Sequence, residues 1–135
     1  MSDASLHANF RGATVERIVR GEGHARIDCA LRSGERIAIH LEGVMLIRMQ
    51  NEDARTLVGA IEIGHGHKVR DLAHKAFAPE GCRDQPWLKG VARRALLGQL
   101  CYFGLQPRLG AEIACLCERV AILSACESQR TEAAA

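Results

Sequence analysis

The stretch that decides the fold is HARIDCALRSGERIAIHLEGVMLI, residues 24–47. Apolar residues recur in it at every second position: Ala25, Ile27, Cys29, Leu31, Ile37, Ile39 and Leu41. A period of two is typical of a half-buried strand, and Ser33-Gly34 between the two runs predicts a tight turn. Strand-like residues 13–20 come before, and residues 44–47 are apolar on both faces. The sequence therefore predicts a four-stranded antiparallel meander over about residues 13–49.

The second half of the chain carries helix signals. Asn51 is a good N-cap, and apolar residues follow at helical spacing as far as Gly64, which predicts a helix over 52–64. A strand over 57–63 is the competing interpretation, because that stretch is also β-branched. Further helices are predicted over residues 68–78, 86–103 and 110–127. The predicted fold class is α+β: an N-terminal antiparallel four-stranded β-meander followed by three to four helices packed on one face.

Length and composition fit one domain. The 135 residues are 47% hydrophobic and 25% charged, which is ordinary for a folded protein. We expect a flexible N-terminal arm over 1–12, a single domain over 13–127 and a flexible tail over 128–135. The N-terminus lacks the plan of a signal peptide, and no run reaches the ~18 apolar residues of a membrane helix. These features predict a cytoplasmic protein without a membrane partner, and its six cysteines are expected to be reduced.

His65 and His67 form the most suggestive local feature. Residues two apart in an extended loop point to the same side, so both imidazoles would reach one metal ion. His74 and Cys82 follow, and they complete a nitrogen-and-sulfur set suited to Zn²⁺ or Ni²⁺. The alternative is a glycine-rich turn with exposed histidines, because the spacing matches no established pattern of metal ligands.

The step Gly64-x-x-His67 ends a predicted helix about sixteen residues after a strand. It resembles the Gly-x-x-His step of the urease nickel metallochaperone family over some thirty residues of this chain. The remainder departs from that family, because the upstream domain is shorter and no His-rich tail ends the sequence. The resemblance implies that this chain binds a metal ion, which a test for bound metal would examine.

The stretch 95–105 is apolar almost all round. A helix of that kind is either buried in the core or covered by another subunit. The candidate interface residues are Leu97, Leu100, Phe103, Cys115 and Ile122. Cys115 and Cys117 form a C-x-C pair, but on a helix they lie about 200° apart and cannot chelate one ion. Packing in the core or in an interface is the expected role of these thiols.

Lys89, Arg93 and Arg94 form a basic stripe at positions i, i+4 and i+5 of a predicted helix. Such a stripe is able to contact phosphates. It is more often a solvated face, three charges give weak affinity, and the net charge of the chain is only +2. Nucleic acid is therefore not the expected partner.

The leading hypothesis is a small non-enzymatic binding or accessory protein that acts through protein–protein contacts, as a homo-oligomer or with another partner. The alternative is a metal-binding or metal-delivery protein that uses the His65–His67 loop and holds Zn²⁺ or Ni²⁺. The third is a small enzyme with a Cys/His site. No catalytic residue is assigned, because no nucleophile elbow, phosphate loop or dinucleotide-binding glycine pattern is present. No other cofactor is predicted.

Overall fold

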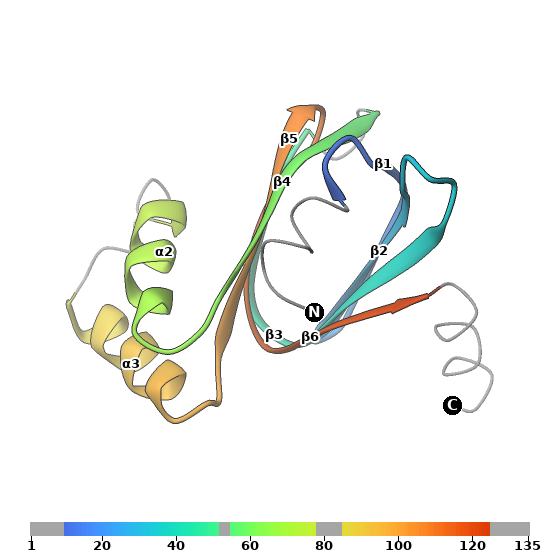
Figure 1. Ribbon diagram of the computed structural model, residues 1–135. Coiled ribbons are helices and arrows are strands. Elements are labelled where there is room, and N and C mark those ends of the chain that lie inside the picture. Colours follow the sequence, from blue (N-terminus) through green and yellow to red (C-terminus); the bar gives the residue numbers. More distant parts are fainter. Residues whose placement is uncertain (1–9, 52–54, 78–84, 125–135) are drawn as a thin grey trace.

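A computed structural model describes residues 10–51, 55–77 and 85–124 of the chain. The strands of this part are β1 (Thr14–Gly21), β2 (His24–Ala30), β3 (Arg36–Gln50), β4 (Thr56–Gly64), β5 (Cys101–Leu109) and β6 (Glu112–Ser124). The helices α2 (Lys68–Phe77) and α3 (Gln85–Leu96) lie between β4 and β5. The strands form a closed antiparallel barrel in the order β1-β2-β3-β6-β5-β4, and β4 pairs back onto β1 (Figure 1). The predicted meander with three to four helices is therefore wrong: the fold is mostly β.

The first three strands follow the alternation in the sequence. Ile27 on β2 pairs with Ile39 on β3, and both side chains are fully buried inside the barrel. The third and fourth predicted strands are one strand, because β3 continues for 15 residues. Gly43, whose φ is +63°, and a register shift between Val44 and Leu46 let β3 bend where a break was expected.

The helix predicted over 52–64 is wrong in its described part, and the competing strand is correct. β4 pairs with β5 over most of its length. Register shifts on either side of Val58 leave Val58 and Ile61 both buried in the barrel core, three residues apart. That spacing imitates a helical period, which explains the prediction. Asn51, the expected N-cap, instead adopts a left-handed φ of 58°.

The helix predicted over 86–103 is correct only as far as Leu96, and the helix predicted over 110–127 is wrong, because β6 occupies 112–124. Residues 101–105 of β5 and 113–117 of β6 are buried on both faces, whereas the remaining residues of both strands are partly or fully exposed. Phe103 and Cys115 point into the barrel core, whereas Tyr102 and Leu116 face the helices. A strand that is buried on two faces has a continuous apolar run in its sequence. Such a run does not distinguish a strand from a buried helix.

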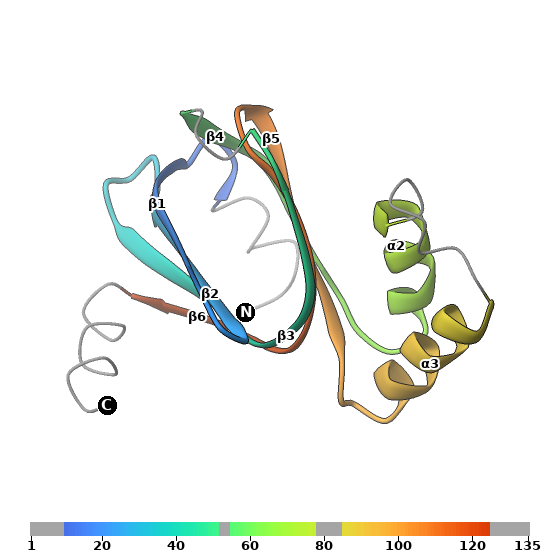
Figure 2. The ribbon, with the colours of Figure 1, turned by 180° about the vertical axis from the view of Figure 1, so that it is seen from behind.

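The prediction of a helix over 68–78 is confirmed by α2. Together α2 and α3 form what we call the helical hairpin (residues 68–77 and 85–96), which stands beside the barrel in both views (Figures 1 and 2). Its apolar cluster includes Val69, Phe77 and Val91 and continues onto Tyr102 and Leu116 of the barrel. Two apolar clusters, one inside the barrel and one under the hairpin, therefore share β5 and β6.

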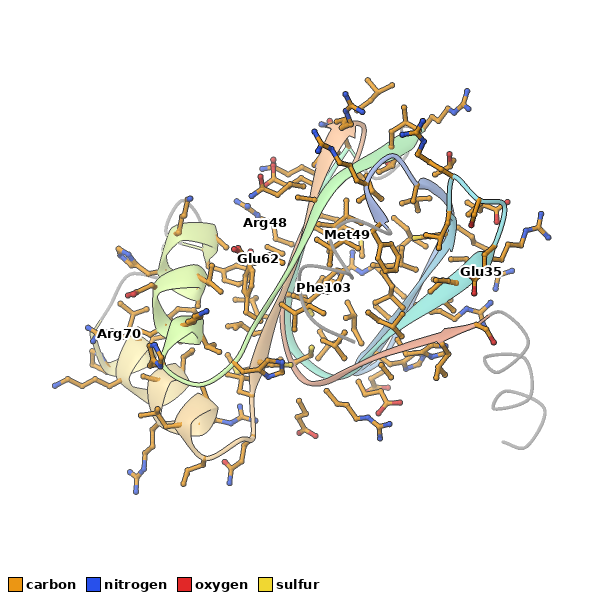
Figure 3. All side chains as sticks on the ribbon, viewed as in Figure 1. Glu35, Arg48, Met49, Glu62, Arg70 and Phe103 are labelled. Carbon is orange, nitrogen blue, oxygen red and sulfur yellow. The ribbon has the colours of Figure 1, made fainter. Side chains whose placement is uncertain are left out.

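The barrel interior is filled by side chains, among them Phe103 and Met49 (Figure 3). Phe10 also belongs to this core and is 1% exposed, although it falls within the arm predicted over 1–12. The predicted tail over 128–135 lies outside the described residues. Neither α2 nor α3 has the length and apolar character needed to cross a membrane.

Candidate functional site

The three predicted metal ligands that the structure describes, His65, His67 and His74, lie in and just before α2. His65 and His67 are both exposed in the connection from β4 to α2, and His74 is exposed on α2. The backbone turns at Gly66, whose φ is +58°, so the segment is not the extended loop that the metal hypothesis assumed. Cys82 lies outside the described residues. Within the described ranges, no group of three or more His, Cys, Asp or Glu is placed to hold a metal ion. The metal site stays a prediction.

In the described part of the chain, four buried free thiols line the barrel core: Cys29, Cys101, Cys115 and Cys117. The predicted separation of Cys115 and Cys117 around a helix is wrong, because β6 is a strand and residues two apart share a face. Cys101 lies directly opposite Cys117, and their Sγ atoms are 3.9 Å apart. β5 and β6 therefore bring three thiols together on one inner surface.

The surroundings of Cys29, Cys101 and Cys117 raise the pKa of each of these three thiols and keep them protonated. Burial, reinforced by nearby carboxylates, raises the pKa of Cys29 to about 12. Contact with Cys117, together with burial, raises the pKa of Cys101 above the usual range of a thiol. At Cys117 the contact with Cys101 lowers the pKa, but contact with Cys115 and burial outweigh it and raise the pKa to about 12. Because the thiolate is the nucleophile and the metal ligand, these thiols serve as apolar core.

We expect the barrel thiols to be unreactive toward the thiol reagent DTNB at pH 8 while the protein is folded. A raised pKa delays ionisation, so at pH 8 roughly one Cys29 thiol in ten thousand is a thiolate. Reactivity appears only as the pH approaches about 12 or as the fold opens. The measurement uses a Cys82→Ser/Cys126→Ser variant, which removes the cysteines outside the described residues, and counts labelled thiols before and after guanidinium is added.

A matched control adds Leu97→Cys to the same background. This exposed position is expected to label at once in buffer, whereas the four barrel thiols label only in guanidinium. Labelling of a barrel thiol at pH 8, with an unchanged circular dichroism spectrum, would show that the barrel core is open to solvent.

The predicted interface residues do not share one surface. Leu97 is 64% exposed, whereas Leu100, Phe103 and Cys115 are between 0 and 2% exposed and lie inside the fold. Ile122, on β6, is half-buried against the barrel core. These residues were predicted to lie on two helices, whereas α3 ends at Leu96 and strands β5 and β6 carry Phe103, Cys115 and Ile122.

The C-terminal end of α3 presents two adjacent exposed leucines. The exposed fractions of Leu96 and Leu97 are 68% and 64%. The helix ends there because Gly98 adopts a left-handed φ of +74°, which is typical of a helix C-terminus. Among the described residues, the other large apolar side chains with high exposure are Met45 and Leu109. Leu109 ends β5, the opposite end of that strand from α3, so the paired leucines are the most concentrated exposed apolar feature.

Two cations lie on the same side of α3 as these leucines. Lys89, Arg93, Leu96 and Leu97 are all exposed and fall within about 100° of the helix surface. We call these four residues the α3 stripe. Arg94, which the sequence grouped with Lys89 and Arg93, turns away from the stripe. It is half-buried, and its Nη1 donates to Sδ of Met45 at 3.2 Å, which links α3 to β3.

Positive charge is concentrated on the helical hairpin. Its cations are Lys68, Arg70, Lys75, Lys89, Arg93 and Arg94. Asp71 is the one carboxylate on these two helices, whereas the whole chain has a net charge of only +2. These two helices are therefore much more basic than the protein as a whole.

A hollow of about 290 Å³ lies beside the end of α3. Its lining includes His65, Leu96, Leu100, Glu118 and Arg119. Sequence reasoning missed Leu96, Glu118 and Arg119. Glu118 and Arg119 were placed on a predicted helix, whereas β6 carries them to the end of α3. Leu96 could have been found from the sequence, because it lies three residues after Arg93 and therefore on the same side of the helix.

No protein-family model, curated protein or solved structure matches this chain. Its function is therefore inferred from surface chemistry and geometry. Among the described residues, the α3 stripe combines two adjacent exposed leucines with two exposed cations.

Proposed function

We propose that this chain is a non-enzymatic binding protein that acts by docking another protein on the α3 stripe. The observation that carries the proposal is the exposure of two adjacent leucines, Leu96 and Leu97, at 68% and 64%. Covering apolar surface is favourable by about 25 cal/mol for each Å² removed from water. Two neighbouring leucines on one helix end supply a compact area for a partner to cover.

The stripe is held on a rigid support, which favours docking. On the opposite side of α3, Val91 and Ala95 are 2% and 3% exposed and belong to the cluster under the hairpin. Leu100, just beyond the helix, is buried in the same cluster. Because these contacts fix the helix on the barrel, little conformational entropy is lost when the stripe is covered.

A partner other than a second copy of this chain is favoured. A symmetric dimer through the stripe would place the same patch on both subunits. It would therefore bring two strongly basic hairpins together, including Lys89 and Arg93 of each copy. Repulsion between like charges opposes that arrangement. We thus expect the isolated protein to be monomeric at the concentrations used for size-exclusion chromatography with light scattering.

The test is affinity capture of the partner from the cells that express the protein, followed by titration calorimetry with the purified partner. The Leu96→Ser/Leu97→Ser variant is expected to bind at least about tenfold more weakly than the wild type, because burying one leucine side chain contributes about 1.5–3 kcal/mol and about 1.4 kcal/mol is a tenfold change in affinity. Leu109→Ser is the matched control, since Leu109 is 58% exposed at the far end of β5 and should leave binding unchanged.

Equal binding by the wild type and the double serine variant would contradict the proposal. A loss of binding with Leu109→Ser instead would move the docking surface to the other end of the barrel. Unchanged circular dichroism of all three proteins is required for either conclusion, and it is expected because every substituted leucine is exposed.

A further inference from the structure

We infer that the partner segment is acidic as well as apolar, with aliphatic side chains that cover Leu96 and Leu97 and carboxylates that face Lys89 and Arg93. This inference rests on the proposed function and adds the chemistry of the partner to it. It is carried by the juxtaposition of two exposed cations and two exposed leucines on one side of α3.

The order of residues along α3 sets the pattern that a partner must match. Lys89 and Arg93 are one helical turn apart, and Leu96 and Leu97 come one turn later. The stripe from Lys89 to Leu97 is therefore about 12 Å long, at about 1.5 Å for each residue. A segment that lies along it meets charge over the first turn and apolar surface over the second.

The carboxylates that form ion pairs in the described part of the chain lie elsewhere and leave these two cations unpaired within that part. The ion pairs of the barrel join its own strands: Arg17–Asp28, Arg26–Asp28, Arg36–Glu16, Arg48–Glu112 and Arg119–Glu42. Within the residues that the structure describes, Lys89 and Arg93 form no ion pair with a carboxylate. Both side chains are exposed and remain available to an acidic partner.

Charge complementarity also favours protein over nucleic acid as the occupant. Phosphates would engage Lys89 and Arg93 but would leave the two leucines in water. Base stacking on single strands uses exposed aromatic rings. The aromatic residue of α3, Trp87, is half-buried and packs edge to face on Phe77, with ring centroids 6.4 Å apart. An acidic aliphatic segment would contact both the cations and the leucines of the stripe, whereas a polynucleotide would contact the cations alone.

The experiment selects peptides from a random library of about 16 residues displayed on phage. The immobilised full chain is the bait, and the library is first depleted on the Leu96→Ser/Leu97→Ser variant. Enriched peptides are expected to contain neighbouring aliphatic residues together with an excess of Asp and Glu over Lys and Arg. A fluorescein-labelled peptide from the enriched pool then serves as the probe for anisotropy titrations.

Charge reversal provides the second measurement. Lys89→Glu/Arg93→Glu should weaken binding of the probe by at least about tenfold, and raising NaCl from 50 to 500 mM should weaken binding to the wild type in the same direction. Arg55→Glu/Arg108→Glu changes the net charge equally at exposed positions near the other end of β5, so it should alter affinity less than about threefold.

The failures of the two proposals are distinguishable. Enriched peptides that depend on Leu96 and Leu97 but lack an acidic excess would overturn this inference and leave the proposed function standing. If no enriched peptide depends on the leucines, both fail. A labelled single-stranded oligonucleotide that binds the wild type, loses affinity with Lys89→Glu/Arg93→Glu and ignores the double serine variant would also overturn both, in favour of nucleic acid.

Discussion

Leu100→Glu is expected to unfold the protein, whereas Leu97→Glu leaves the free energy of unfolding within about 0.5 kcal/mol of the wild type. Leu100 is 2% exposed in the cluster under the helical hairpin, whereas Leu97 is 64% exposed. A carboxylate at position 100 must either remain charged without water or bind a proton, and both cost several kcal/mol. We expect a loss of at least about 4 kcal/mol, a large part of the ~5–15 kcal/mol that stabilises a typical domain.

Urea unfolding followed by circular dichroism measures this difference. Leu100→Met is the control for a change of shape without charge, and it should cost less than about 1.5 kcal/mol. A Leu100→Glu protein that unfolds at the wild-type urea concentration would mean that Leu100 faces solvent or a partner. That outcome would contradict the burial of Leu100 in the cluster under the helical hairpin.

The pairing of β1, β2 and β3 could be predicted from the sequence because each strand has one face toward water. On β2 and β3, Ile27 and Ile39 point into the barrel, while the paired Arg26 and His40 are partly exposed on the other face. Alternation of this kind needs no knowledge of the rest of the fold. The length of β3 was missed because Gly43 reads as a turn residue, although here it bends a strand that continues.

The same rule could not find β5 and β6, because the helical hairpin covers part of their outer surface, around Tyr102 and Leu116. Tyr102 and Phe103 are neighbours on β5 that point in opposite directions, yet they are 7% and 0% exposed (Figure 3 shows Phe103 inside the barrel). The reason lies in α2 and α3, which pack on Tyr102 from elsewhere in the sequence. Burial on two faces is a tertiary property, and it removed the alternation on which strand prediction depends.

The candidate site was predicted in part for a related reason. Lys89 and Arg93 were placed correctly on the exposed side of a helix, and Leu97 was named as an interface residue. Leu100 was grouped with Leu97 because the helix was extended past Gly98. The position at which α3 ends determines which leucines are exposed. That position is set by the left-handed turn at Gly98 and by the pairing of β5 with its neighbours.

Phe103→Ala is expected to lower the free energy of unfolding by about 3–5 kcal/mol, the usual cost of removing a fully buried aromatic ring. The position also tests whether the two apolar clusters unfold together. Phe103 fills the barrel, while its neighbour Tyr102 packs under the hairpin. Trp87 is the single tryptophan of the chain and lies in the hairpin cluster, so its fluorescence reports on the hairpin while circular dichroism reports mainly on the strands.

Because β5 belongs to both clusters, the fluorescence and circular dichroism transitions of the wild type should coincide, and Phe103→Ala should move both by the same amount. Leu109→Ala, on the same strand but 58% exposed, should move neither by more than about 0.5 kcal/mol. A shift in circular dichroism with an unchanged Trp87 transition would show that the hairpin folds independently. In that case, contacts with the barrel would not hold Leu96 and Leu97 in place for docking. The rigidity of the α3 stripe would come from contacts within the hairpin alone.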